Sequence, residues 1–243
     1  VPKIVHCKSH NLKLFDLPAS FFSLFFPSLC AACSRNLRRG EQVICTHCRF
    51  TLPMTDHFTS HDNPMERLFA GKSRITHAAA LYRFEKGSRV QQMVHGLKYG
   101  ERKDVGILAG EIIGERMSRT GRFGRIDVVV PVPLHASRLR KRGYNQAECI
   151  SEGICRATGW RHQPDGLRRI RNSETQTNKQ RFERFTNIDG IFEASEVNAF
   201  TGCSILLVDD VITTGSTLIG CADVLLASDD VQVSVVAMAA AVH

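Results

Sequence analysis

Stretches with the apolar pattern of strands alternate with stretches of helical spacing along most of the chain. In residues 88–100, for example, Val90, Met93, Val94 and Leu97 recur at the spacing of one helix face. The expected strands cover residues 77–85, 126–134, 205–208 and 231–240, and the expected helices cover residues 88–100, 104–119, 145–158 and 216–227. Strands that alternate with helices predict an α/β fold built on a parallel sheet.

One of these strands is followed directly by two acids. Residues 205–208 are all apolar, as expected for a strand covered on both faces, and Asp209 and Asp210 come next. Ligands of parallel sheets bind beyond the carboxyl ends of the strands. We therefore expect a binding site in the loops at residues 131–138 and 209–217.

A hydroxyl-rich turn after the acids opens the next expected helix. It consists of Thr213, Thr214, Gly215, Ser216 and Thr217. Free amides at a helix start, hydroxyls beside them and a glycine that permits close approach form a cradle for a phosphate. The acids would repel that phosphate, so we expect them to accept hydrogen bonds from neutral hydroxyls, with a divalent cation held through water. A phosphate beside two hydroxyls describes a ribose 5-phosphate.

Two other phosphate-related motifs share parts of this string. A P-loop requires a lysine before its final serine or threonine, and none precedes Ser216 in this way. Response-regulator receivers carry an acidic pair after an apolar strand near the start of their domain, whereas Asp209 and Asp210 lie close to the end of this chain. We retain both as minor alternatives.

Four cysteines in the first fifty residues have the spacing of metal ligands. Cys30 and Cys33 form one C-x2-C pair, and Cys45 and Cys48 form a second. Two such pairs complete a tetrahedral shell around a structural Zn²⁺. A redox pair or unligated core cysteines are the alternatives. Arginines between the pairs, at positions 35, 38 and 39, leave open a role of this module in docking nucleic acid or protein.

The composition is that of an ordinary folded chain with a basic surface. The net charge of +8 over 243 residues indicates a polyanionic partner, or solubility alone. Nine cysteines, four of them in metal spacing, favour a reducing cytoplasm over a disulfide framework. The apolar segment 14–29 is interrupted by Asp16, Pro18 and Pro27, so we expect neither a signal peptide nor membrane insertion. The expected organisation is a cysteine module at 1–55, a polar linker at 56–76 and an α/β domain at 77–243.

The string "ILLVDDVITTGST" resembles the signature of type I phosphoribosyltransferases, which bind 5-phosphoribosyl-1-pyrophosphate (PRPP). Together with "DVVVPVPLHASRLRKRGYNQAECIS", "RRIRNSETQTNKQRFERFTNIDGIF" and the cysteine pairs ahead of "VHGLKYG", it is similar in order and spacing to the ComF family over almost the whole chain. The resemblance implies a zinc ribbon joined to a phosphoribosyltransferase domain, and a role in DNA uptake or DNA utilisation.

Site residues follow from the same resemblance. Asp209 and Asp210 would bind the ribose hydroxyls, and residues 213–217 would bind the 5-phosphate. The remaining expected contacts to PRPP are Val211, Pro133, Leu134 and Arg138, and the expected catalytic cations on a hood over residues 168–184 are Arg169, Arg171 and Arg184. Mg²⁺ would accompany the pyrophosphate.

The sequence does not identify the acceptor of the phosphoribosyl group. The alternative function is a binding module for single-stranded nucleic acid or protein, in which the PRPP site is a sensor or a relic. The family resemblance also implies a competence helicase as a partner.

Overall fold

The computed structural model of the protein describes residues 28–170, 191–195 and 200–241. The helices are α2 (Thr46–Thr51), α3 (Pro64–Phe69), α4 (Arg89–Tyr99), α5 (Lys103–Thr120), α6 (Ala136–Arg142), α7 (Gln146–Thr158) and α8 (Ser216–Leu225). The strands are β1 (Ile75–Arg83), β2 (Val128–Pro131), β3 (Arg161–His162), β4 (Leu167–Arg169), β5 (Phe192–Ala194), β6 (Ser204–Ile212) and β7 (Gln232–Ala240).

Five of these strands form a parallel sheet in the order β1-β7-β6-β2-β3. The strand β6 lies in its middle, paired with β7 on one side and with β2 on the other. Residues 205–208 of β6 are buried, as their unbroken apolar run predicts for a strand covered on both faces. The structure confirms the expected α/β fold with a parallel sheet.

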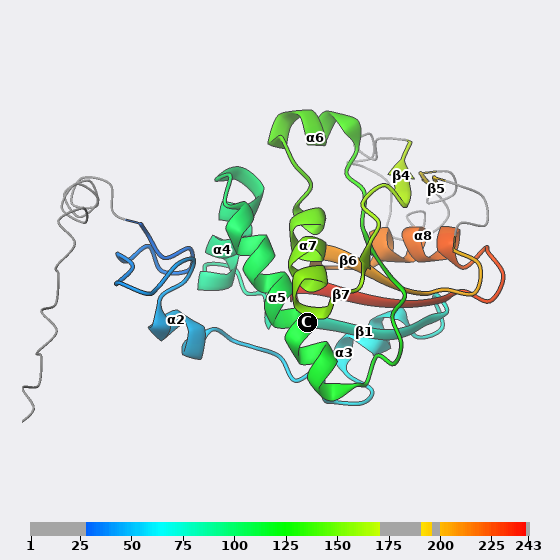
Figure 1. The fold of residues 1–243 in the computed structure, drawn as a ribbon, viewed down its shortest axis with the longest axis horizontal. Coiled ribbons are helices and arrows are strands. Elements are labelled where there is room, and N and C mark those ends of the chain that lie inside the picture. The colour runs from blue at the N-terminus through cyan, green and yellow to red at the C-terminus, as the bar shows by residue number, and fades with distance from the viewer. Residues whose placement is uncertain (1–27, 171–190, 196–199, 242–243) are drawn as a thin grey trace, which may run out of the picture.

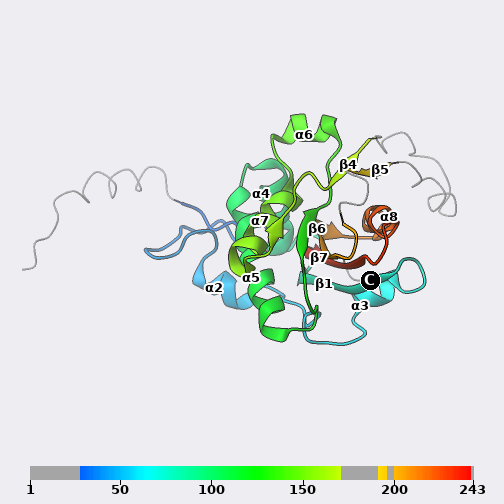
Figure 2. The ribbon, with the colours of Figure 1, turned by 45° about the vertical axis from the view of Figure 1, so that its right-hand side comes forward.

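Helices cover both faces of this sheet (Figures 1 and 2). Helices α4, α5 and α7 lie on one face, and α3 and α8 lie on the other. Each face has its own buried core, with Met93 of α4 and Ile113 of α5 in the first and Phe69 of α3 and Leu218 of α8 in the second. Within the described residues, no helix has both the length and the apolar character that a bilayer crossing requires.

Glycines allow α5 and α7 to pack backbone against backbone. A Cβ added to Gly153 of α7 would lie 2.0 Å from the carbonyl oxygen of Ile107, and one added to Gly110 of α5 would lie 2.0 Å from that of Ile150. Real carbon–oxygen contacts never approach this distance, so any side chain here would separate the helices. This packing fixes the position of α7, whose first turn faces the carboxyl edge of the sheet.

The segment expected as a linker at residues 56–76 is a packed part of the fold. It contains α3, which is capped by the buried side chain of Asn63, and it includes the first residues of β1. The Asn63 side chain accepts hydrogen bonds from the amides of Met65 and Glu66 and donates to the carbonyl of Ala78 in β1. A polar residue is buried here because it satisfies the backbone of two elements at once.

Two further points differ from the sequence-based expectations. No strand was expected in residues 161–187, but their described part contains β3, which joins the main sheet, and β4, which pairs with β5 in a separate two-stranded antiparallel sheet. The loop expected over residues 131–138 ends earlier, because helix α6 begins at Ala136. In Figure 1, α6 projects from the body of the molecule above α7.

Candidate functional site

The two acids lie at the carboxyl edge of the sheet, in the second half of β6 rather than beyond its end. Asp209 pairs in register with Ala237 of β7, and the strand continues to Ile212. On the other side, Pro131 at the end of β2 pairs with Val208. Because these strands are parallel, the loop after β2 emerges beside the acids, as the sequence predicts for two ligand-side loops.

The environment of Asp209 opposes its ionisation. Burial raises the pKa of the Asp209 carboxyl to about 7, and the charge of Asp210 acts in the same direction. A hydrogen bond from the Asp210 amide to Asp209 Oδ1, 2.8 Å long, and the charges of Lys98 and Arg169 partly offset this rise. A carboxyl group whose pKa is raised in this way, at the edge of a sheet, is typical of a functional site.

Lys98 forms an ion pair with the second acid. Its Nζ lies 2.9 Å from Asp210 Oδ2, and only 24% of the lysine side chain and 14% of the aspartate side chain are exposed. The sequence reasoning missed this residue. Its signal was a cation four residues after Val94, at the edge of the buried face of α4.

The hydroxyl-rich turn connects β6 to α8 as expected. Thr213 and Thr214 are exposed, and the hydroxyls of Thr214 and Ser216 are 3.0 Å apart. The N-cap residue of α8, Gly215, provides no side-chain cap, and the Ser216 amide makes only a long hydrogen bond of 3.5 Å to Thr214 Oγ1. An anion can therefore bind the first amides of the helix, with two hydroxyls beside them.

Gly215 is required in this turn for two reasons. Its φ of +74° is in the left-handed region that side chains disfavour. A Cβ at this position would also lie 2.6 Å from Phe69 Cε1 and 3.3 Å from Leu68 Cδ2. Side chains of helix α3 thus pack against the turn. The segment expected as a linker therefore helps to shape the candidate phosphate cradle.

The loop between β2 and α6 is held in place from two sides. The amide of Val132 donates to the Val208 carbonyl of β6 over 2.8 Å, and the side chain of Asn145 at the start of α7 donates to the Val132 carbonyl over 3.0 Å. Next to this loop, His135 caps α6 by accepting from the Ser137 amide. The predicted ligands Pro133 and Leu134 lie within it, and Arg138 lies half-buried in the first turn of α6.

The predicted cations are only partly within the described structure. Arg169 ends β4, with its guanidinium carbon 5.3 Å from the centre of the Phe192 ring, and its charge lowers the pKa of Asp209. It is therefore brought toward the acidic pair. Arg171 and Arg184 lie outside the described residues.

Two surface cavities lie away from the acids. One, of about 460 Å³, is lined by Ser73, Arg74 and Asp223, but these groups already bond to each other or to backbone carbonyls. The other, of about 510 Å³, is lined by Arg161, Arg168 and the base of the β4-β5 sheet. Neither combines acids with a helix start, so the edge at β6 is the stronger candidate for a sugar-phosphate ligand.

The four predicted cysteines converge at the N-terminal module. All four Sγ atoms lie within 4.8 Å of one another, and those of Cys33 and Cys45 are 3.8 Å apart. A tetrahedral Zn²⁺ with bonds of about 2.3 Å spaces its thiolates by about 3.8 Å, so the geometry fits this ion. The amide of Cys45 donates to Cys30 Sγ over 3.2 Å, which stabilises a thiolate. The four-cysteine cluster fits a structural zinc site.

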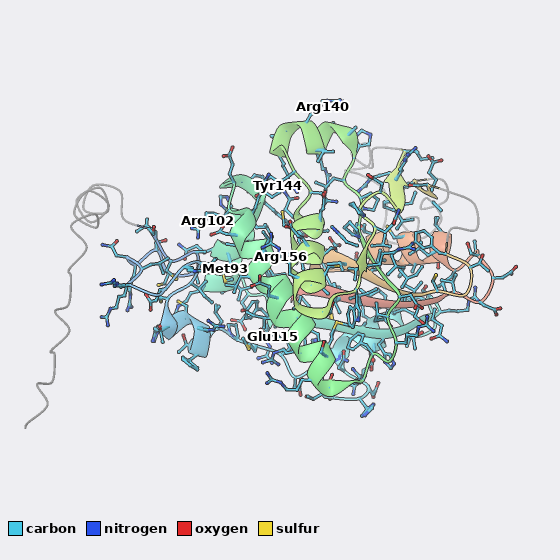
Figure 3. The ribbon with its side chains drawn as sticks, in the orientation of Figure 1. Met93, Arg102, Glu115, Arg140, Tyr144 and Arg156 are labelled. Atoms are coloured by element: carbon cyan, nitrogen blue, oxygen red, sulfur yellow. The ribbon has the colours of Figure 1, made fainter. Side chains whose placement is uncertain are left out.

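The N-terminal module contacts α4, the helix that carries Lys98, through hydrogen bonds from Arg89 to Thr51 and from Gln92 to Ser34. Cys30 and Cys48 belong to the same buried core as Met93, the residue labelled on α4 in Figure 3. Arg102, just after α4, donates to the Leu29 carbonyl over 3.3 Å. The N-terminal module is thus joined to the α/β domain through the helix that reaches the acidic pair.

We expect Asp209→Asn to stabilise the protein more at pH 8 than at pH 5. The unfolded chain loses the Asp209 proton near the ordinary pKa of 3.8, whereas the folded chain keeps it to about 7. Stability therefore falls as the pH rises through this interval, and an amide removes that loss while keeping the acceptor for the Asp210 amide. Each kcal/mol gained shifts the Tm by roughly 2–4 °C in a chain of this size.

The measurement is thermal unfolding at both pH values without divalent cations. The exposed Asp229→Asn serves as the control and should change the Tm equally little at both. An Asp209→Asn effect that is the same at pH 5 and pH 8 would contradict the assigned environment.

We expect Cys48→Ser to remove the metal and to destabilise the whole chain. Purified wild-type protein should contain one zinc per chain by elemental analysis, and the variant much less. Its Tm should fall by more than about 5 °C, because the cluster shares its core with α4. Cys203→Ser, at a half-buried position outside the cluster, should retain zinc. Full zinc content in the Cys48 variant would refute the assignment.

Comparison with known proteins yields relatives but no family model that matches. The chain is 36% identical over 101 residues to competence protein F of Haemophilus influenzae, covering 41% of this chain and 44% of that protein. It is 40% identical over 91 residues to competence protein ComFC of Bacillus subtilis, covering 37% of this chain and 35% of that protein. It is 26% identical over 212 residues to DNA utilization protein YhgH of Escherichia coli, covering 85% of this chain and 88% of that protein.

Two solved structures show partial similarity. An allosteric regulatory enzyme of purine biosynthesis matches with a TM-score of 0.38 at 19% identity, over 58% of this chain and 30% of that one. A hypoxanthine phosphoribosyltransferase from Staphylococcus aureus matches with a TM-score of 0.34 at 14% identity, over 56% of this chain and 62% of that one. The matched segments span less than half of each competence protein, whereas the match to YhgH extends along most of both chains. The sequence resemblance to the ComF proteins is thus confirmed, and the chain is a relative of the competence proteins F and ComFC and of the DNA utilization protein YhgH.

Proposed function

We propose that the protein binds PRPP with Mg²⁺ at the carboxyl edge of its sheet and acts as a phosphoribosyltransferase. One observation carries the proposal: Asp209 and Asp210 stand on β6 just ahead of a hydroxyl-rich helix start whose N-cap is a glycine. The acids offer acceptors for two vicinal hydroxyls, and the amides and hydroxyls at 213–217 offer donors for a phosphate. A ribose 5-phosphate carries both groups, the 2- and 3-hydroxyls on its ring and the phosphate on its exocyclic C5.

The loop between β2 and α6 supplies the pyrophosphate side of the site. It emerges beside the acids, and its backbone is fixed by Val208 and Asn145. Pro133 and Leu134 in the loop and Arg138 in α6 are the proposed contacts to pyrophosphate, and Val211 lines the ribose. Mg²⁺, which supplies charge neutralisation on the pyrophosphate oxygens, would enter with the substrate.

In the proposed reaction a nitrogen nucleophile bonds to C1 of the ribose while the bond from C1 to the pyrophosphate oxygen breaks. The leaving pyrophosphate takes the electron pair, so negative charge grows on its oxygens. Cations fixed around it before the reaction stabilise this change without reorganising. Arg169 is the proposed cation within the described structure, and Arg171 and Arg184 are proposed on the basis of sequence alone.

The relatives support a role in DNA uptake or DNA utilisation, in line with the names competence protein and DNA utilization protein. All eight cysteines among the described residues are free of disulfides, which supports a reducing cytoplasm as the compartment.

A second function, in which the PRPP site is a sensor, is favoured by helix α6. Arg140 and Lys141 are exposed on this projecting helix, and Figure 3 shows Arg140 at its far side from the sheet. Exposed cations on a projecting helix suit a phosphate backbone such as that of single-stranded DNA. A competence helicase is the protein partner that we propose in this setting.

We expect replacement of both acids, Asp209→Ala with Asp210→Ala, to weaken PRPP binding by at least about 100-fold. Hydrogen bonds to charged groups contribute roughly 1.5–3 kcal/mol each, and two hydroxyls would lose their acceptors. Isothermal calorimetry with PRPP and constant Mg²⁺ measures the change. The exposed Asp229→Ala should bind as the wild type does, and unchanged affinity in the double variant would refute the site.

Assays on the wild type and on a variant of helix α6 distinguish the two functions. Pyrophosphate release from PRPP with at least one member of a panel of nitrogenous bases would establish transfer. PRPP binding without release, together with binding of a single-stranded oligonucleotide that is lost on Arg140→Ala with Lys141→Ala, would support the sensor.

A further inference from the structure

An ammonium group occupies the binding edge beside the acid that the proposed function assigns to the ribose. Lys98 Nζ is 2.9 Å from Asp210 Oδ2, and both side chains are mostly buried. Lys98 reaches this position from the last turn of α4, which lies on the face of the sheet opposite to α8, the helix that the turn at 213–217 opens (Figures 1 and 2). The lysine is thus part of the site rather than of the distant surface.

A purely structural role does not account well for this arrangement. Bringing a lysine and an aspartate out of water costs free energy that their attraction seldom exceeds, so such pairs are weak stabilisers of a fold. Asp209 lies beside this pair, so one cation faces two acids. An apolar pair would serve stability better, whereas a site that must bind hydroxyls and several phosphate oxygens needs both signs of charge.

Resting on the proposed function, we propose that Lys98 exchanges partners and is a binding residue for the pyrophosphate group of PRPP. In the free protein its ammonium holds Asp210. When the sugar binds, Asp210 accepts hydrogen bonds from the ribose hydroxyls, and the ammonium turns to the pyrophosphate oxygens. Lysine suits this exchange because its charge is compact and its stem of four carbons is flexible.

The chemistry of the ligand places the two partners close together. The 2-hydroxyl and the pyrophosphate are attached to neighbouring ribose carbons, so a cation bonded to the carboxylate that holds this hydroxyl lies near the leaving oxygens. The loop between β2 and α6 approaches the acids along β2, on the neighbouring strand of the sheet. Lys98 would therefore contact a group that ribose 5-phosphate lacks, which gives the test its specificity.

The test compares two ligands on Lys98→Met by isothermal calorimetry at constant Mg²⁺. PRPP affinity should fall roughly 10- to 100-fold, the range for loss of one charge-assisted hydrogen bond. Ribose 5-phosphate lacks the pyrophosphate, so its affinity should fall far less. Lys98→Arg, which keeps the charge, should recover most of the PRPP affinity. Lys86→Met is the matched control, because Lys86 is exposed in the turn at the opposite end of α4.

The possible failures are distinguishable. Equal weakening of both ligands in Lys98→Met, in a variant whose thermal unfolding stays cooperative, would show that Lys98 only positions Asp210 and would overturn the inference. Unchanged PRPP affinity would also overturn it, while leaving the proposed function in place. If the wild type binds neither ligand, the proposed function itself fails and the inference with it.

Discussion

The central constraint in this protein is the placement of two carboxylates on an interior strand. Asp209 and Asp210 follow four buried apolar residues of β6, and burial together with their mutual repulsion raises the pKa of Asp209 to about 7. Such a pair needs nearby cations or ligand hydroxyls. The surrounding elements supply the cations: Lys98 from α4 and Arg169 from β4 reduce the repulsion.

The rest of the fold holds this edge in position. Helix α3 packs under Gly215 and shapes the start of α8, and the close contact of α5 with α7 fixes Asn145 beside the loop after β2. The four-cysteine module bonds to α4 through Ser34 and Thr51 and shares its buried core. A metal module that the sequence presents as a separate appendage is therefore part of the framework that positions Lys98.

The elements predicted correctly are those whose pattern is long and local. The buried run in β6 and the amphipathic face of α4 can be recognised without knowledge of the fold, and C-x2-C pairs reveal their ligands by spacing alone. Helix α3 was missed because its segment is polar and short, and it depends on Asn63 and on β1 for its stability. The ion pair of Lys98 with Asp210 joins residues far apart in the chain, which no local pattern encodes.

A crystal structure of the protein with PRPP and Mg²⁺ tests the central claim most directly. The account predicts the ribose hydroxyls on Asp209 and Asp210, with the 5-phosphate on the amides and hydroxyls of residues 213–217. A ligand bound elsewhere, with the carboxyl edge of β6 left empty at saturating concentration, would contradict it.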